Sequence, residues 1–450
     1  MNAPSGRPRY WLPRKFCNSF ERYVGLQVYS HLQSAEHKSI DMTSVLTVTA
    51  AKSIEEMLAS PSVQAAFSFF DSHKEEITEE QIRICSIPAP PFDEKRRAAY
   101  LCERFSEIGL EDARIDEEGN CLALRRGRCL SPLLVVSAHL DTVFPPGTDF
   151  TVRRIANKLL APGISDDGCG LVALLAIARA LDLARIVTEG SILFVGTVGE
   201  EGAGNLRGVR YLFGRGRWSR RIDAFISFDG GGIGRITNGA LGSRRYRVRL
   251  RGTGGHSWAD FGVANPIHAL GRAISRLASY PAPTRPRTTF NVGRIEGGSS
   301  VNAIPREAVI EVDLRSASEY ELLRLDAFFR RAVREAADDE NTTRRKDDLP
   351  LELNLQLIGE RPSGETRADS PIVELAQEAT RALGFTPRLD QASTDSNVPI
   401  SLGVPAITLG GGGMSGNSHT IDEWYDPRDR EAGLKRALLV ILGMVKVKTG

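Results

Sequence analysis

Five short clusters of histidine, aspartate and glutamate recur along the chain, and four of them contain glycine. They are SAHLDT (137–142), GISDDGCG (163–170), GTVGEEGAG (196–204), SFDGG (227–231) and GNSHTIDEWYD (416–426). Imidazole and carboxylate groups suit zinc, with cobalt or manganese as substitutes. Two such ions about 3.5–4 Å apart need roughly five or six protein ligands, usually with a bridging carboxylate. The clusters therefore predict a site for two divalent metal ions, held by His139, Asp166, Glu201, Asp229 and His419.

Two further carboxylates lie next to these expected ligands. Asp141 is two residues beyond His139, close enough to accept the other imidazole N–H and fix its tautomer. Glu200 is adjacent to Glu201 in a turn, so we expect its side chain to point away from that ligand. A carboxylate beside a water activated by the metals is what a general base requires, and Glu200 is our candidate.

Each cluster taken alone has a simpler explanation. Asp166 and Asp167 could cap the helix that follows them, and Glu200 and Glu201 could form a solvated turn. The recurrence of the clusters, each just past an expected strand, argues against these explanations.

The expected strands are apolar runs that alternate with helical patterns. LLVVSAH (133–139), SILFVGT (191–197) and DAFISFD (223–229) are typical of buried strands, and a helix is expected from Gly168. This alternation predicts an α/β fold with a mostly parallel central sheet and helices on both faces. Ligands of open α/β sheets bind beyond the carboxyl ends of the strands, which is where the clusters lie.

The pattern changes from about residue 243, where a second, smaller domain is predicted. YRVRL (246–250) and AVIEVDLR (308–315) alternate apolar and charged residues, as strands with one solvated face do. Asn265 followed by Pro266 begins one helix, and Ser318 with Glu321 forms a capping box for another. We expect an N-terminal arm at 1–52, possibly disordered, and a catalytic domain at 53–242 and 347–450, with an α+β domain inserted at 243–346 that ends in a charged linker.

The composition excludes several classes of protein. The 450 residues include 58 Lys and Arg against 56 Asp and Glu, a formal charge of +2, which gives no case for binding nucleic acid or an anionic membrane. No apolar run approaches the length of a membrane span, and the basic N-terminus lacks the apolar segment of a secretory signal. The six cysteines form no C-x-x-C pair, so we expect free thiols in a reducing cytoplasm.

The order H-x-D, D-D, E-E, D and a late H resembles the M20 family of metallopeptidases, over roughly residues 60–445. SAHLDT, GTVGEEG and RGTGGHS (251–257) are close to the family's motifs, and peptidase T-like members are the nearest match. The resemblance implies that His139 and Asp229 bind one metal, Glu201 and His419 the other, and that Asp166 bridges them. It also implies a cis peptide bond between Asp166 and Asp167.

The inserted domain resembles the family's lid and dimerisation domain. His256 resembles a lid histidine that reaches a neighbouring active site and stabilises the oxyanion; a structural hydrogen bond in a turn is the lesser alternative. Asn302 resembles a lid asparagine that contacts substrate. Arg315 could bind a substrate carboxylate bidentately, or it could pair with Asp313 or Glu311; the residues favour neither. His268, on the lid helix, is expected to be structural.

The resemblance implies a two-metal hydrolase that cleaves an amide bond in short peptides, as a di- or tripeptidase or another exopeptidase. An N-acyl-amino-acid deacylase is the alternative, since it uses the same metal chemistry. A catalytically silent binding protein would have lost the base or a ligand, and every expected position is filled. No G-x-S-x-G motif supports a serine hydrolase, and the glycine runs lack the lysine of a P-loop. A homodimer through the lid is also expected.

Overall fold

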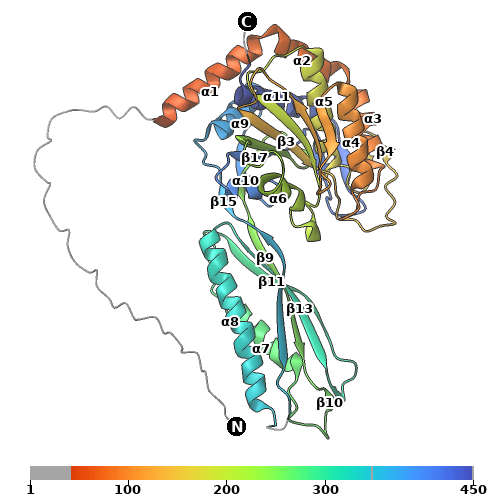
Figure 1. Ribbon diagram of the computed structural model, residues 1–450, viewed down its shortest axis with the longest axis vertical. Helices are drawn as coiled ribbons and strands as arrows, with labels where there is room; N and C mark the ends of the chain where they lie inside the picture. The colour runs from red at the N-terminus through yellow and green to blue at the C-terminus, as the bar shows by residue number, and fades with distance from the viewer. Residues whose placement is uncertain (1–41, 346–347, 448–450) are drawn as a thin grey trace, which may run out of the picture. The chain divides into compact units, whose positions relative to one another are not determined.

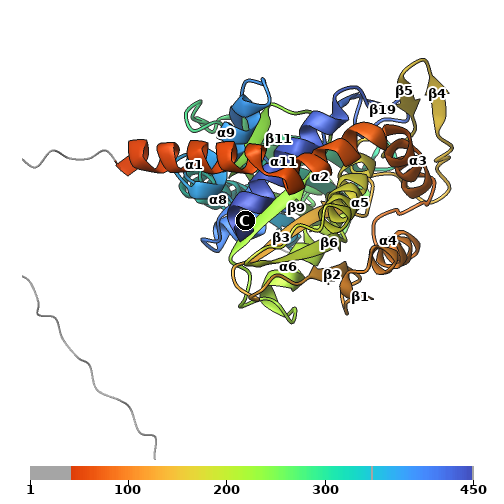
Figure 2. The same cartoon turned by 90° about the horizontal axis from the view of Figure 1, so that it is seen from above.

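The computed structural model describes residues 42–345 and 348–447 (Figure 1). Residues 1–41 of the expected N-terminal arm lie outside the described residues. Helix α1 (Met42–Ala59) begins within the segment expected to be the arm, so residues 42–52 are helical. Figure 2 shows α1 running along the same side of the molecule as α9 (Pro371–Ala382) and α11 (Arg430–Val445), which it contacts.

In the described part of the chain, nine strands form the central sheet. In sequence they are β1 (Glu111–Ile115), β2 (Cys121–Arg125), β3 (Leu133–His139), β6 (Ser191–Thr197), β7 (Ala224–Phe228), β8 (Arg235–Ala240), β15 (Gly364–Glu365), β16 (Arg388–Ala392) and β17 (Ala406–Leu409). The main path across the sheet is β1-β2-β6-β3-β7-β17-β8-β15, with β16 paired to β8. The four central strands β6, β3, β7 and β17 run parallel.

The edges of this sheet differ from the mostly parallel sheet that the sequence predicts. β1, β2 and β6 pair antiparallel, as do β17, β8 and β15. The turn at residues 116–120 that joins β1 to β2 is too short for a parallel crossover, so these edge strands must run antiparallel. The sheet is therefore mixed, with a parallel centre.

Helices cover both faces of the sheet, as predicted. On β3, Leu134 and Val136 face one apolar core, while Leu133 and Val135 face another. The first core is completed by α1, α2 (Pro61–Ser72), α3 (Lys74–Cys85), α4 (Lys95–Ile108), α5 (Gly168–Leu183), α9 and α11. The second is completed by α6 (Arg207–Gly214) and α10 (Asn397–Ser401). Burial on both faces explains the continuous apolar runs of β3 and β6.

The smaller domain is a four-stranded antiparallel sheet with two helices on one face. Its strands, in the order β11-β13-β9-β14, are β11 (Thr288–Gly297), β13 (Glu307–Ser316), β9 (Gly242–Arg251) and β14 (Glu352–Arg361). Burial alternates along β13, with Ile310, Val312 and Leu314 buried against helices α7 (Pro266–Ala278) and α8 (Glu319–Thr343). The half-exposed sheet expected from the sequence is confirmed. β14 extends it past residue 346, the expected boundary, because the charged segment connects α8 to a further strand.

A third small sheet brings the late histidine segment beside the second cluster. It has the order β18-β19-β5-β4, with β18 (Met414–Gly416), β19 (Trp424–Asp426), β5 (Lys158–Leu160) and β4 (Arg153–Ile155). The remaining elements are a short 3-10 helix η1 (Gly202–Gly204) and the strand pair β10 (Gly255–His256) and β12 (Ala303–Ile304). No helix in the described ranges is long and apolar enough to cross a membrane.

The expectation of free thiols throughout is wrong at one pair. Cys102 on α4 and Cys121 at the start of β2 form a disulfide. They are 19 residues apart in the sequence, and only the packing of α4 on the sheet brings them together. Cys85, Cys129 and Cys169 are free, and Cys17 lies outside the described residues.

Candidate active site

The expected metal ligands meet at one edge of the central sheet. His139 is the last residue of β3, Asp229 directly follows β7, and Glu201 lies in the turn after β6. Because β3, β6 and β7 are parallel, their carboxyl ends share this edge. Asp166 lies just before α5, and His419 lies in the loop between β18 and β19.

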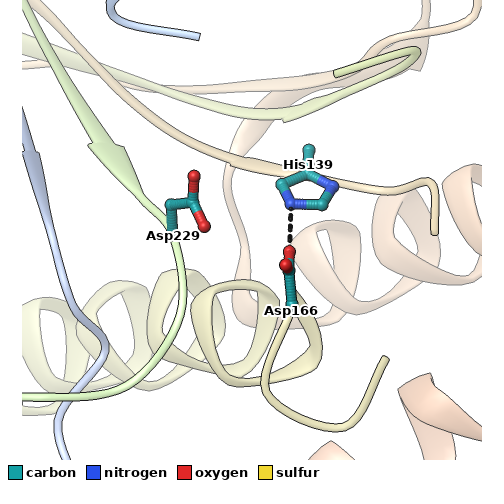
Figure 3. Close-up of side chains that lie close together, drawn as sticks. All are labelled: His139, Asp166 and Asp229. Atoms are coloured by element: carbon teal, nitrogen blue, oxygen red, sulfur yellow. Dashed lines mark hydrogen bonds and ion pairs between the residues drawn. The ribbon is translucent and has the colours of Figure 1, made fainter. Parts of the chain in front are cut away.

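Two groups of three potential ligands share Asp166. His139, Asp166 and Asp229 form the first, with His139 Nε2 2.9 Å from Asp166 Oδ1 (Figure 3). Asp166, Glu201 and His419 form the second, with His419 Nε2 3.1 Å from Asp166 Oδ2 and 2.9 Å from Glu201 Oε1. Within each group the candidate ligand atoms lie within 4.8 Å of one another. The peptide bond between Asp166 and Asp167 is cis, as expected.

The protonation of these groups fits a site built for cations. Burial raises the pKa of Asp229 to about 7, and the negative charge of Asp166 adds to the shift. Hydrogen bonds to Asp166 and Glu201 raise the pKa of His419 to about 10. Without a metal ion, protons therefore offset the repulsion among crowded carboxylates, and a bound cation would displace them. The donor set, imidazole and carboxylate, suits divalent transition metals.

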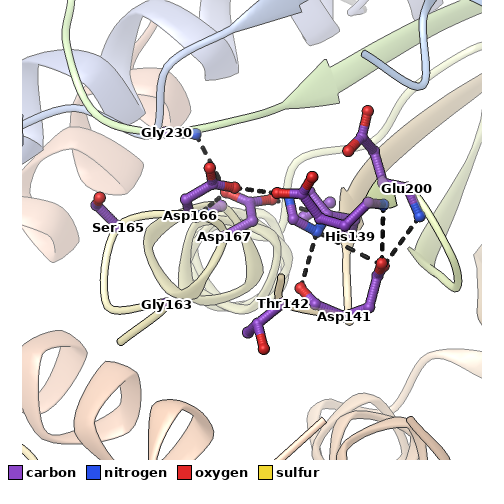
Figure 4. Close-up of polar contacts among 12 residues, drawn as sticks. His139, Asp141, Thr142, Gly163, Ser165, Asp166, Asp167, Glu200 and Gly230 are labelled. Atoms are coloured by element: carbon purple, nitrogen blue, oxygen red, sulfur yellow. Dashed lines mark hydrogen bonds and ion pairs between the residues drawn. The ribbon is translucent and has the colours of Figure 1, made fainter. Parts of the chain in front are cut away.

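Asp141 acts differently from the expected contact with His139. Its main-chain carbonyl oxygen lies 3.0 Å from His139 Nδ1, whereas its nearest carboxylate oxygen is 3.7 Å away. The carboxylate instead accepts the main-chain N–H groups of Glu200 at 3.0 Å and Glu201 at 2.8 Å (Figure 4). Asp141 thus fixes the turn that carries these two residues.

Glu200 is buried and paired with an arginine that sequence reasoning did not identify. Arg361, the last residue of β14, places Nη1 2.7 Å from Glu200 Oε1. Burial raises the pKa of Glu200 well above its ordinary value, although the positive charge of Arg361 opposes the shift. Arg361 is 161 residues from Glu200 in the sequence, and no local pattern marks it.

Glu423 is a second residue that sequence reasoning missed. Its fully buried carboxylate accepts the N–H groups of Gly163, Ser165 and Asp166 and the hydroxyl of Ser165, at 2.7–2.9 Å. It therefore ties the Asp166 loop to the segment that carries His419. An acidic residue four positions after His419 was visible in the sequence, but its partners were not.

Asp167 caps α5, which is the simpler role considered for the D-D pair. Its carboxylate accepts the N–H of Gly170 at 3.1 Å and that of His139 at 3.2 Å. Asp166, by contrast, points to the histidines. The two adjacent aspartates thus have separate functions in the structure.

A cavity of about 440 Å³ opens over this cluster. Its lining combines Asp166, Glu200, Glu201, Asp229 and His419 with four arginines, Arg235, Arg245, Arg315 and Arg361. Arg315 Nε donates to Asp313 Oδ2 at 2.6 Å, so it lines the cavity and also makes one of the two ion pairs considered for it. Arg235 pairs with Asp390 at 2.6 Å.

The lid residues His256 and Asn302 lie elsewhere in the same chain. His256 is exposed on β10, and its Nδ1 accepts the main-chain N–H of Trp258 at 3.2 Å. Asn302 is exposed beside β12, and its side-chain oxygen accepts the Ser300 hydroxyl at 2.5 Å. Neither lines the cavity. His268 is exposed on α7, and its Nδ1 lies 3.8 Å from Glu340 Oε1.

The chain is similar to several known proteins. A succinyl-diaminopimelate desuccinylase from Leptothrix cholodnii is 29% identical over 249 residues, which are 49% of this chain and 63% of that protein. The crystal structure of aminopeptidase PepT from Bacillus cereus superimposes with a TM-score of 0.67 at 22% identity, over 83% of this chain and 99% of that one. A dinuclear metal-binding peptidase of family M20 from Bacillus subtilis matches with a TM-score of 0.61 at 16% identity, over 83% and 99%.

The family model described as peptidase family M20/M25/M40 matches residues 135–443, more than half of the chain and all five clusters. The protein therefore belongs to peptidase family M20/M25/M40, and is a metal-dependent hydrolase of amide bonds.

Proposed function

We propose that this protein is a two-metal exopeptidase that cleaves short peptides such as di- and tripeptides. The observation that carries the proposal is the pair of three-residue ligand groups that share Asp166, with Glu200 in the same cavity. His139 and Asp229 would hold one ion, Glu201 and His419 the other, and Asp166 would bridge them. Two bound cations supply Lewis acidity to a water and to the scissile carbonyl.

The protein's own groups would move the proton and orient the substrate. Glu200 would take a proton from the attacking water and deliver it to the leaving amine. Asp141 would keep Glu200 and Glu201 in register through their main-chain N–H groups. Zn²⁺ is the proposed ion, with Co²⁺ or Mn²⁺ as substitutes, because imidazole and carboxylate ligands suit them.

An N-acyl-amino-acid deacylase is the second candidate. The desuccinylase from Leptothrix cholodnii, similar over half of this chain, supports it, and the same metal site would serve both reactions. Incubating the metal-loaded enzyme with a mixed library of di- and tripeptides and N-acyl amino acids, then identifying products by mass spectrometry, separates the two. Cleavage of acylated substrates alone would replace the exopeptidase proposal with the deacylase.

The general base is tested by Glu200→Gln. The substitution keeps the size of the side chain but removes its basicity, so kcat should fall by about 10²–10⁴-fold. Metal content, measured by inductively coupled plasma mass spectrometry, should equal that of the wild type, because Glu200 is not one of the proposed ligands. Wild-type turnover in this variant would refute the assignment.

We also propose that the protein forms a homodimer through the smaller domain, in which His256 of one chain completes the cavity of the other. The position of His256 supports this, since it is exposed and away from the cavity of its own chain. Its Nδ1 accepts main-chain hydrogen bonds, which places the proton on Nε2 as a potential donor to a developing oxyanion.

A further inference from the structure

Arg361 holds Glu200 at two points. One guanidinium nitrogen, Nη1, donates to Glu200 Oε1 at 2.7 Å, and the other, Nη2, donates to the main-chain carbonyl oxygen of the same residue. Nη1 also donates to Ser393 Oγ at 2.9 Å. Both partners are buried, each with 6% of its side chain exposed. An ion pair removed from water in this way has a defined geometry, unlike a surface pair.

We propose that Arg361 is the positioning residue of the general base, an inference that rests on the proposed function. With Oε1 engaged by Arg361, Oε2 is the oxygen left to take a proton in the cavity. The second bond, to the main-chain carbonyl oxygen of Glu200, also holds the backbone of the turn. Movement of the backbone therefore does not displace the carboxylate. A base acts efficiently only within a narrow range of positions, and a displacement of about 1 Å can cost about 10²-fold in rate.

The same arginine connects the base to the strand that leads back from the smaller domain. Arg361 ends β14, and the residue before it, Glu360, donates its N–H to Asn205 Oδ1 at 2.8 Å. Arg210 donates Nη2 to the carbonyl oxygen of Glu360 at 2.6 Å. The end of β14 is therefore fixed to the segment that follows Glu201, and the position of Glu200 depends on where that strand lies.

Two other roles for Arg361 predict different kinetics. If Arg361 bound a substrate carboxylate, its removal would raise KM and leave kcat almost unchanged. If it only held the end of β14 in place, removing Arg210 would have a similar effect, because Arg210 binds Glu360 and Asn205 without touching Glu200. If Arg361 positions the base, its substitution should lower kcat, and substitution of Arg210 should not.

The experiment compares Arg361→Met, Arg361→Lys and the control Arg210→Met in metal-loaded full-length protein. Methionine matches the length of the arginine stem without its donors, so kcat should fall about 10²-fold, with KM within twofold of the wild type and metal content unchanged. Lysine keeps the positive charge but lacks the rigid planar fork that binds the carboxylate and the carbonyl oxygen together, so kcat should be intermediate. Arg210→Met should retain at least half of the wild-type kcat.

A double-mutant cycle with Glu200→Gln then tests whether Arg361 acts through the base. In the Glu200→Gln background, Arg361→Met should lower the residual kcat by less than twofold. A further loss as large as in the wild-type background, or a rise in KM at unchanged kcat, would overturn the proposal. If Arg361→Met does not fold, as judged by circular dichroism, Arg361→Lys serves in the same cycle. Wild-type turnover of Glu200→Gln alone would instead refute the assignment of Glu200 as the general base, on which this inference rests.

Discussion

At the scale of single residues, Asp395 is a buried carboxylate in which one of the two oxygens has no hydrogen-bond partner among the described residues. Its Oδ2 accepts the Thr197 hydroxyl at 2.5 Å, while Oδ1 has no hydrogen-bond partner among the described residues. Burial raises the pKa of Asp395 from 3.8 to about 6. The folded protein therefore binds this proton more tightly than the unfolded chain, and the contribution of Asp395 to stability becomes less favourable as pH rises from about 4 to 6.

Asp395→Asn should remove that dependence. The amide oxygen can still accept the Thr197 hydroxyl, and a neutral side chain has no charge to bury. We expect the variant to gain up to about 3 kcal/mol of unfolding free energy over the wild type at pH 7, and no gain at pH 3.5. Urea unfolding at several pH values measures this difference, and curves that stay parallel from pH 3.5 to 7 would contradict it.

Arg315 and Arg245 line the cavity and share one carboxylate partner. Arg315 Nε lies 2.6 Å from Asp313 Oδ2, and Arg245 Nε lies 3.4 Å from Asp313 Oδ1. Two guanidinium groups therefore share one carboxylate. Arg315→Ala should raise KM at least about 10-fold for substrates with a free carboxylate, and far less for the corresponding amides. Arg247 is the matched control, since it pairs with Glu311 at 2.7 Å and does not line the cavity. Equal effects on acids and amides would argue against a carboxylate site.

At the scale of elements, the start of α7 depends on one side chain. Asn265 Oδ1 accepts the N–H of Ile267 at 2.9 Å and that of His268 at 3.4 Å, which satisfies donors that the helix itself cannot pair. Asn265→Ala should lower the unfolding free energy of the smaller domain by about 1 kcal/mol, while Asn265→Ser should retain most of it. Thermal unfolding of the three proteins checks this, and an alanine variant as stable as the serine variant would contradict it.

At the scale of the whole molecule, the proposed dimer predicts that two inactive variants can restore each other. Chains with Glu200→Gln and chains with His256→Ala should each lose activity. After mixing and subunit exchange, heterodimers should contain one cavity with both Glu200 and His256, and activity should reach about a quarter of the wild type for random exchange. Native mass spectrometry confirms the exchange. If activity does not recover, His256 acts within its own chain or has no role in catalysis.

The chemistry at the ends of the strands could be predicted from the sequence. The apolar runs that form β3, β6 and β7 are local patterns, and each is followed at once by the residues of its cluster. Because parallel strands align their carboxyl ends, the meeting of His139, Asp229 and Glu201 followed from the order of the elements. The capping residues Asn265 and Ser318 were also local, and both side chains accept helix N–H groups. The capping box is only half formed, because the N–H of Ser318 donates to Ser316 Oγ and the Glu321 carboxylate pairs with Arg324.

The groups that support that chemistry depend on how distant segments pack together. Arg361 reaches Glu200 across 161 residues, and Glu423 reaches Asp166 across 257. The Cys102–Cys121 pair, the antiparallel edges of the sheet and the pairing of β14 with β9 likewise depend on segments that packing brings together. A local pattern specifies the direction of a side chain relative to its own element. The partner that it meets depends on where a distant element packs, and a single sequence holds no direct record of that.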